Sequence, residues 1–313
     1  MARLIASRLI AAVPIAVGVA LVVFLVLRLV PGDPARVMLG ADAQAADVER
    51  VRQQLGLDRP LAIQFALFLQ RAVRGDLGYS YYFKDSVITL IRGTLPATVE
   101  LAAVALVTAV AIAVPLGVVA ALRQHTAADY GSMGLAVLGV AMPPFWLGIL
   151  LIYLFGVKLR WLPAMGHGGP LWTLEGLRHV LLPAITLGSV MLASTTRLTR
   201  AAMLDVLSED YVRTARAKGL TGRQIVYGHA LRNALIPVVT NLGLQMGMLL
   251  GGAFLTETVF AWPGIGRLSV DAMFRRDYPL VQGTLLMVTL VFLLVNLLVD
   301  VVYVMIDPRI SYE

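Results

Sequence analysis

The sequence is dominated by long apolar stretches without charged residues. The clearest runs from Tyr278 to Val299 and lies directly between Asp277 and Asp300. A transmembrane helix needs roughly 20 mostly apolar residues, and this stretch is long enough. Five further stretches share this character: Leu9–Leu27, Leu101–Leu122, Gly131–Val157, Val180–Thr196 and Ala234–Thr256. The sequence therefore predicts an all-α integral membrane protein with six transmembrane helices.

Composition supports this class and excludes others. Only 14% of the residues are charged and the mean hydropathy is +0.80, which leaves too little polar surface for a soluble globule. The absence of cysteine excludes disulfides and thiolate metal sites, and the four histidines have no metal-ligand spacing, so no metal site is expected. In so apolar a chain, a net charge of +7 indicates cytoplasmic loops rather than nucleic-acid binding.

Charge distribution predicts the topology. Arg3 and Arg8 precede the first span and favour a cytoplasmic N-terminus, and six spans place the C-terminus on the same side. The first stretch is too long for a signal peptide and lacks a cleavage site. Residues 31–93 are long and nearly charge-balanced, so we expect an extracytoplasmic segment with short helices over 47–55 and 62–73 rather than a separate core. The organisation expected is an N-terminal helix (1–30), this segment, a core of five spans (94–306) and a cytoplasmic tail (307–313).

One connection differs from the rest of the chain. Residues 201–233 include a basic stretch, "DYVRTARAKGLTGRQIVYGHALRN" from residue 210, between two apolar spans. Ser208 is a suitable N-cap, and Gly219 stands where a left-handed residue ends many helices, so a short helix is predicted over 209–218. Thr221 and Gln224 have capping-box spacing and open a second helix that runs into the fifth span.

Two interpretations of this basic stretch remain open. Its positive charges could fix the orientation of the chain in the membrane and contact anionic lipid headgroups. Alternatively, a rigid, doubly capped helix with small residues at its centre suits insertion into a groove of a partner protein. Leu207, Tyr211 and Ala215 recur at helical spacing and predict its less polar face.

The basic stretch also resembles the cytoplasmic loop of type I ABC-transporter permeases. The loop pattern there is Glu-Ala-Ala, three residues, Gly, and an ending like Ile-x-Leu-Pro. Here it reads Arg213-Thr214-Ala215, then Gly219, then Leu235-Ile236-Pro237. The basic first position and the longer gap to the proline are similar to the dipeptide, oligopeptide and nickel branch, in particular its B subunits.

Further stretches resemble that branch, in order along nearly the whole chain. They are "RLVPGDPA" (28–35), "RGDLGYS" (74–80), "LPATVELA" (95–102), "TETVFAWPGIGRL" (256–268) and "DPRI" (307–310). The resemblance implies the type I ABC importer permease fold with both termini in the cytoplasm.

The resemblance gives the basic stretch a role. In that family the loop is a coupling helix, which seats in a cleft of a cytoplasmic ATPase and carries the ATPase's motion to the spans. Ala215 and Ala217 would allow close approach, Gly219 the turn, and the basic residues pairing with acids of the partner. The residues expected to couple are Ser208, Asp210, Tyr211, Arg213, Thr214, Ala215, Arg216, Ala217, Lys218 and Gly219.

The segment after the fifth span has two readings. Phe260 and Trp262 could be ordinary interfacial aromatics. The resemblance instead implies a re-entrant segment near an outer gate that faces the binding protein, with Pro263, Gly264 and Gly266 in a tight non-helical backbone. The residues expected on this side are Glu257, Phe260, Trp262, Pro263, Gly264 and Gly266.

Polar residues within the spans form a candidate translocation path. Asn241 and Gln245 share one face of the fifth span, and Ser189 lies in the fourth. Polar groups at this depth must face protein or water, so either a substrate path or hydrogen bonds between helices explains them.

No catalytic motif is present. The chain lacks a Gly-x4-Gly-Lys-Ser/Thr loop, a His-Glu-x-x-His pair and a Gly-x-Ser-x-Gly elbow, so it is expected not to be an enzyme. A secondary transporter is the alternative of another class, but no acidic residue is predicted mid-membrane and no internal repeat is found.

The resemblance implies an ATP-driven importer in the bacterial plasma membrane. The expected substrate is a di- or oligopeptide, with nickel chelates, glutathione or another small solute as alternatives. Expected partners are a second, related permease, two ATPase subunits that bind ATP and Mg, an extracytoplasmic binding protein and lipid, but no nucleic acid.

Overall fold

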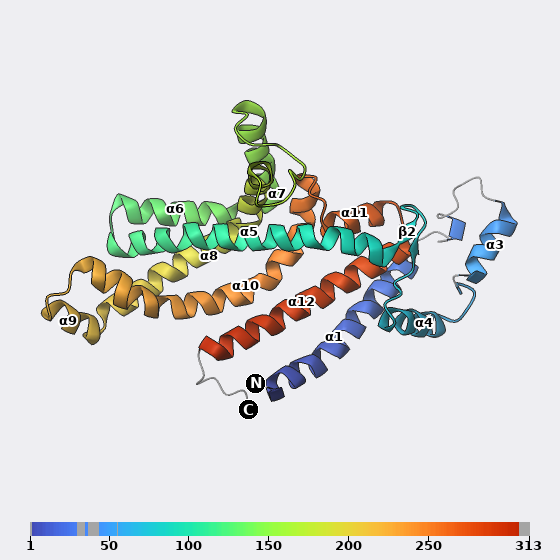
Figure 1. Ribbon diagram of the computed structural model, residues 1–313, viewed down its shortest axis with the longest axis horizontal. Coiled ribbons are helices and arrows are strands. Elements are labelled where there is room, and N and C mark those ends of the chain that lie inside the picture. Colours follow the sequence, from blue (N-terminus) through green and yellow to red (C-terminus); the bar gives the residue numbers. More distant parts are fainter. Residues whose placement is uncertain (1, 30–34, 37–43, 55, 307–313) are drawn as a thin grey trace. The chain divides into compact units, whose positions relative to one another are not determined.

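Helices form nearly all of the computed structural model, which describes residues 2–29, 35–36, 44–54 and 56–306 (Figure 1). The predicted tail at 307–313 and most of the "RLVPGDPA" stretch lie outside these residues. Two compact units are present, Met1–Thr98 with Pro263–Leu297 and Val99–Trp262 with Leu298–Glu313. Each is described by itself.

Four helices are long and apolar enough to cross a membrane, and the number rises to six if each of two bent pairs is one span. The four are α1 (Ala2–Leu29), α5 (Val87–Leu122), α8 (Leu174–Ser208) and α12 (Tyr278–Ile306). The all-α fold with up to six spans agrees with the prediction. Both α5 and α8 begin well before the predicted spans, and α8 also ends later, at Ser208.

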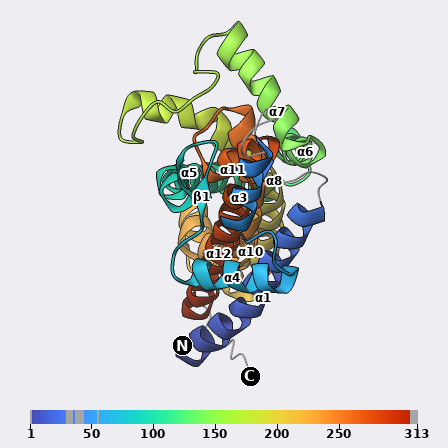
Figure 2. The same ribbon diagram turned by 90° about the vertical axis from the view of Figure 1, so that its right-hand side faces the viewer.

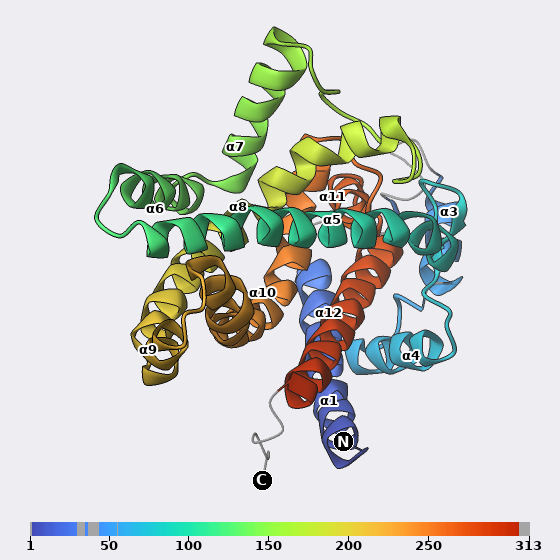
Figure 3. The same cartoon turned by 60° about the vertical axis from the view of Figure 1, so that its left-hand side comes forward.

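The predicted third span is not a single straight helix. It consists of α6 (Ala127–Ala141), α7 (Pro144–Leu151) and the π-helix η1 (Ile152–Lys158), with a bend of 106° at the break (Figure 3). Met142 and Pro143 are extended, with ψ of 129° and 133°. Two consecutive prolines cannot donate backbone hydrogen bonds, and a residue before proline disfavours the helical region, so the helix ends here.

The fifth span is bent as well. The π-helix η2 (Gln224–Ala230) continues directly into α10 (Leu231–Val259), and the helix turns by 66° between Gly247 and Gly251. Pro237 lies inside α10 away from this bend. The flexibility of a glycine-bounded stretch therefore sets the bend rather than the proline.

The first unit has a hydrophobic core to which distant segments contribute. Helix α4 (Leu61–Val73) lies beside α1, with the rings of Phe24 and Phe65 centred 5.4 Å apart (Figure 2). The start of α5, helix α11 (Ile265–Phe274) and the start of α12 complete the core. The segment after α1 forms short helices, α3 (Ala45–Gln54) and α4, and α4 contributes to this core.

A small hairpin in this unit was not predicted. Strands β1 (Tyr79–Ser80) and β2 (Asp85–Ser86) pair antiparallel, with Tyr79 opposite Ser86. The Ser80 hydroxyl donates to the Asp277 carboxylate, which also accepts a 3.3 Å hydrogen bond from the backbone N of Leu280. Asp277 therefore caps the start of α12 and holds the hairpin against it.

In the second unit α8 is the central helix, and α6, α7 and α10 all pack on it. Small residues allow α5 to approach as well. A Cβ on Gly117 would lie 2.6 Å from Cβ of Thr199, and one on Gly188 would lie 2.8 Å from the carbonyl O of Ala105. Close approach at glycine is a usual basis of helix association in membranes.

Candidate functional site: the basic segment and its connection to α8 and α10

The basic segment, defined here as residues 209–233, begins at a sharp break after α8. Helix α9 (Asp210–Ala217) has Glu209 as its N-cap, in an extended conformation with ψ of 148°. The prediction of Ser208 as N-cap is wrong, because α8 continues through Ser208 and its hydroxyl donates back to the Asp205 carbonyl at 2.7 Å. A serine that bonds within its own helix cannot cap the next one.

The predicted end of α9 is confirmed. Gly219 has φ of +82°, and its backbone N donates to the Arg216 carbonyl at 3.0 Å. The backbone N of Leu220 donates to the Ala215 carbonyl at 3.3 Å. These two bonds form a Schellman motif, which satisfies carbonyls that a helix end otherwise leaves unpaired.

The capping box is also confirmed. The backbone N of Thr221 donates to Oε1 of Gln224 at 2.9 Å, and the backbone N of Gln224 donates to Oγ1 of Thr221 at 3.4 Å. The helix that starts here runs through η2 into α10 without interruption. Both sides of the turn are therefore fixed by specific hydrogen bonds, and α9 is joined rigidly to α10.

The two faces of α9 differ sharply. Val212 and Ala215 are buried and form a small apolar cluster with Ile225 of η2. The prediction of an apolar face is correct for Ala215 but wrong for Tyr211, which is 41% exposed. Leu207 also packs against the cluster, although it lies in α8. The exposed residues between Glu209 and Gly219 are Glu209, Asp210, Tyr211, Arg213, Thr214, Arg216, Ala217, Lys218 and Gly219.

Burial changes the expected role of the two alanines. Ala215 is only 8% exposed, because it packs on this chain's own η2. Ala217 is exposed. Of the two, only Ala217 offers the close approach to a partner that the sequence suggested for both.

Within the basic segment, a hydrogen bond between distant residues ties α9 to α10. Asn233 Nδ2 donates to the Tyr211 hydroxyl at 2.8 Å. The sequence offered no periodic signal for this pair, since the residues lie on different helices. Helix α9 is therefore connected to α10 in two ways, by this hydrogen bond and by the cluster of Val212, Ala215 and Ile225.

Helix α10 in turn contacts α8 through polar groups of the candidate path. Ser194 donates to Oε1 of Gln245 at 2.8 Å, while Nε2 of Gln245 is buried without a hydrogen-bond partner among the described residues. Asn241 is half-buried one turn earlier. Ser189 is buried and donates to the Thr186 carbonyl at 2.8 Å, so its hydroxyl serves its own helix.

An ion pair that the sequence analysis missed joins α6 to α8. Arg200 donates from Nε and Nη2 to the two carboxylate oxygens of Asp129, both at 2.7 Å. Asp129 also accepts a 3.1 Å bond from the backbone N of His125. This bidentate geometry fixes orientation as well as distance. The only sequence signal was two opposite charges near the ends of neighbouring apolar stretches.

At the other end of α10 the chain makes a tight buried turn. Glu257, Phe260 and Trp262 are fully buried, so the reading of the two aromatics as lipid-interface residues is wrong. Ala261 has φ of +52°, and the backbone N of Trp262 donates to the Glu257 carbonyl at 2.8 Å. The ring of Phe260 lies against Gly148 of α7, where a Cβ would be 3.0 Å away.

The turn is non-helical over a shorter range than predicted. Pro263 and Gly264 are outside helices, but Gly266 lies inside α11, which begins at Ile265. Gly264 is the N-cap, with φ of −97° and ψ of 174°. The backbone N of Ile265 donates to Oγ1 of Thr98 at 2.9 Å, which satisfies one of the free donors at the helix start.

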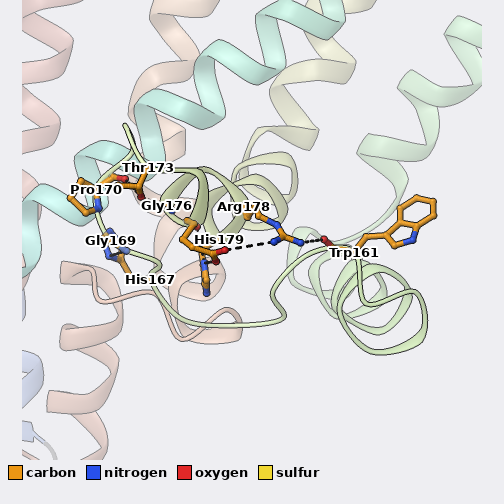
Figure 4. A network of polar contacts seen from close by, with 9 residues as sticks. Trp161, His167, Gly169, Pro170, Thr173, Gly176, Arg178 and His179 are labelled. Atoms are coloured by element: carbon orange, nitrogen blue, oxygen red, sulfur yellow. Dashed lines mark hydrogen bonds and ion pairs between the residues drawn. The ribbon is translucent and has the colours of Figure 1, made fainter.

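A loop before α8 supports this turn. The backbone N of Gly166 donates to the Phe260 carbonyl at 2.8 Å, and the His167 ring lies edge-on to Trp262 at 4.6 Å. Thr173 caps α8 by accepting from the backbone N of Gly176 at 3.0 Å. Figure 4 shows the loop and the start of α8, where Arg178 donates to the Trp161 carbonyl at 2.9 Å.

Together these features define a polytopic helical membrane protein. Its spans carry a rigid basic element at one end of α10 and a buried turn at the other. No group of three or more His, Cys, Asp or Glu that could hold a metal occurs among the described residues.

Comparison with known proteins identifies the family. The family model described as "Binding-protein-dependent transport system inner membrane component" matches residues 113–312, and a companion model for the N-terminal part of such components matches residues 1–102. The chain belongs to this family and is a type I ABC-transporter permease of the peptide/oligopeptide group, a multi-pass protein of the bacterial plasma membrane.

Similar proteins extend over the full length of the chain. It is 45% identical over 313 residues to the glutathione transport system permease protein GsiC of Escherichia coli, with 100% of both chains covered. It is 41% identical to the dipeptide transport system permease protein DppB of Alkalihalophilus pseudofirmus, with 97% of this chain and 98% of that protein covered. A crystal structure of an amino acid ABC transporter with histidines is matched over 71% of this chain and 94% of that chain, at 15% identity and a TM-score of 0.49.

Proposed function

We propose that this chain is the permease subunit of an ATP-driven importer for short peptides, including glutathione. The names of the two relatives above specify transport of glutathione and of dipeptides, and both proteins align over essentially the whole chain. Both solutes are short peptides with free carboxylates. A binding protein outside the membrane delivers the peptide, and two ATPase subunits inside bind ATP and Mg and hydrolyse ATP. A second, related permease completes the path, and both termini of this chain lie in the cytoplasm.

One observation carries the proposed mechanism. The basic segment buries Val212 and Ala215 against its own chain and leaves Arg213, Arg216 and Lys218 exposed. Helix α9 alone is too short to be stable in water, so the cap bonds and this cluster must hold its shape. A surface that is rigid before binding loses little conformational entropy when it docks.

Force on this surface has a direct route to the spans. Closure of the ATPases on ATP binding pulls α9, and the Tyr211–Asn233 bond and the Ile225 contacts pass the movement to α10. Helix α10 packs on α8, and Gln245 meets Ser194 there. Movement of α10 against α8 opens the path outward, the binding protein releases the peptide, and ATP hydrolysis returns the spans to the inward state.

A cross-linking experiment tests the docking. The chain has no cysteine, so each single-cysteine variant carries one unique thiol. Ala217→Cys should form a disulfide with a cysteine placed in the ATPase cleft. Ala215→Cys is the matched control, because its side chain faces η2 and should react poorly. Equal cross-linking of both, or none in a complex that hydrolyses ATP, contradicts the docking geometry.

A transport experiment tests the substrate class. The complete complex in proteoliposomes, with its binding protein, should accumulate glutathione or a dipeptide and show ATP hydrolysis that depends on the loaded binding protein. Accumulation of a nickel chelate without either peptide would overturn the peptide assignment but leave the importer mechanism intact. Accumulation driven by an ion gradient without ATP would overturn both.

A further inference from the structure

The first unit contains a cavity of about 560 Å³ that the transport mechanism above does not use. It lies among the end of α1, the connection from α3 to α4, helix α4, the hairpin and the start of α12, all within that unit. The volume is in the range that holds a small organic ligand. Its apolar wall is formed by Phe24, Leu57, Leu67, Phe68 and Leu77.

Four of the residues that line the cavity each have one buried polar atom with no hydrogen-bond partner among the described residues. These atoms are Nε of Arg28, Oε1 of Gln64, Oη of Tyr278 and Nε2 of Gln282. Gln64, Tyr278 and Gln282 are each more than nine-tenths buried. Buried polar groups are nearly always paired in folded proteins, so this concentration around one cavity requires an explanation.

The character of these atoms indicates an acceptor-rich ligand. Arg28 and Gln282 present donors, and the Tyr278 hydroxyl can donate as well. The amide of Gln64 has a fixed orientation, because its Nε2 donates to the carbonyls of Leu57 at 3.2 Å and Arg59 at 2.7 Å. Its Oε1 is therefore free to accept one hydroxyl from the ligand.

The charges on the cavity wall also favour an acceptor-rich, anionic ligand. Arg28, Arg59 and Arg71 line the cavity, and Asp76 is the only acid among the lining residues. The Asp76 carboxylate already accepts a hydrogen bond from the backbone N of Gly78 at 2.9 Å. Arg28 has no ion-pair partner among the described residues, although the ring of Phe24 lies 5.0 Å from its guanidinium carbon. A partly buried cation is costly unless an anion accompanies it.

We propose that this cavity binds an oxyanion, a phosphate or carboxylate group held by Arg28, Tyr278 and Gln282, with a ligand hydroxyl donating to Gln64. Phe24 and Arg28 end a candidate membrane span, and Tyr278 and Gln282 begin another. The ends of spans lie at the depth of lipid headgroups, so the oxyanion has two sources, an acidic phospholipid headgroup or a soluble anion.

Binding measurements on the assembled transporter test this site. One arm measures phosphatidylglycerol binding to delipidated complex by native mass spectrometry, with phosphatidylcholine as the zwitterionic comparison. The other arm measures the shift of thermal unfolding on titration with inorganic phosphate. The variants are Arg28→Gln and Tyr278→Phe, and the matched control is Arg92→Gln, an exposed arginine of α5 that does not line the cavity.

We expect saturable binding of equal affinity in wild type and Arg92→Gln. In Arg28→Gln the affinity should fall about ten- to a hundred-fold. If this pattern is seen with phosphatidylglycerol, the ligand is a lipid headgroup. If it is seen with inorganic phosphate, the ligand is a soluble anion. Tyr278→Phe keeps the charge and should weaken binding several-fold, so it tests the site even if Arg28→Gln does not assemble. Absence of saturable binding in both arms, or equal affinity in all variants, overturns the proposal and leaves water as the occupant.

Discussion

The two ends of α10 have similar local geometry but differ in burial and in the interactions that hold them. Each carries a tight connection with a left-handed residue, Gly219 at one end and Ala261 at the other. The turn at Gly219 is exposed and held by hydrogen bonds within a short segment. The turn at Ala261 is buried and held by packing of Phe260 and Trp262. One end is suited to present a surface, and the other to fix the spans around it.

This difference predicts which property each end controls. Changes at the exposed end should alter coupling to the ATPase and leave the stability of the spans almost unchanged. Changes at the buried end should destabilise the protein. The predictions below begin with the two largest expected effects and end with the two smallest.

Gly219→Pro should abolish stimulation of ATP hydrolysis by the loaded binding protein. Proline fixes φ near −65°, whereas Gly219 has +82°, and proline removes the N–H that bonds to Arg216. A local penalty of about 3 kcal/mol reduces the population of the docking geometry more than a hundred-fold. ATP hydrolysis by reconstituted complex, with and without binding protein, measures the loss.

Gly222→Pro is the matched control for this variant. Gly222 follows the N-cap Thr221 as the first helical residue, where proline is well tolerated, and a Cβ there would meet no atom within 4 Å. Wild-type stimulation is expected. Equal loss in both variants would show that the segment tolerates no proline at all, and equal retention would make it a topological anchor rather than a coupling element.

Trp262→Ala should cost about 3–5 kcal/mol of unfolding free energy, because it empties a fully buried site beside His167. Trp172→Ala is the control, since that side chain is 85% exposed, and should change stability by at most about 0.5 kcal/mol. Denaturation midpoints in mixed micelles of increasing dodecyl sulfate content compare the two. Similar midpoints for both variants would contradict the expectation that burial of Trp262 stabilises this end of α10.

Thr221→Ala should loosen the start of the second helix by about 1 kcal/mol, since it removes one side of the capping box. Amide hydrogen exchange over residues 222–226 should accelerate about five-fold. Thr214→Ala, which removes only an exposed hydroxyl bonded to the Asp210 carbonyl, should leave that exchange rate unchanged. An unchanged rate in Thr221→Ala would mean that packing, not the capping box, holds the turn.

Tyr211→Phe should have a small effect, a partial loss of coupling without loss of assembly. It removes the bond from Asn233, worth about 0.5–1.5 kcal/mol, and keeps the ring. The ratio of peptide transported to ATP hydrolysed measures coupling. Tyr227→Phe is the control, because Tyr227 is 60% exposed. An undiminished ratio in Tyr211→Phe would leave the Ile225 contacts as the sole route from α9 to α10.

Local signals in the sequence were reliable where short-range chemistry decides the structure. The spans followed from apolar length, the turn of the basic segment from Gly219, and the second helix from Thr221 and Gln224. Each depends on residues within a few positions of one another, so the sequence contains the full interaction. Where Ser208 was expected to cap α9, two local interactions competed, and continuation of α8 prevailed.

Only the tertiary structure showed the partners of residues that are distant in sequence. Asp129 with Arg200, Tyr211 with Asn233 and Ser80 with Asp277 join elements whose proximity depends on the packing of whole helices. Burial of Phe260, Trp262 and Ala215 has the same origin, because an apolar side chain suits lipid and protein interior equally. The sequence by itself determined which stretches are helical and apolar, since backbone hydrogen bonding in lipid leaves helices as the solution for such stretches. The packing of the helices decided which helix faces meet and which polar groups around the cavity of the first unit remain without a hydrogen-bond partner.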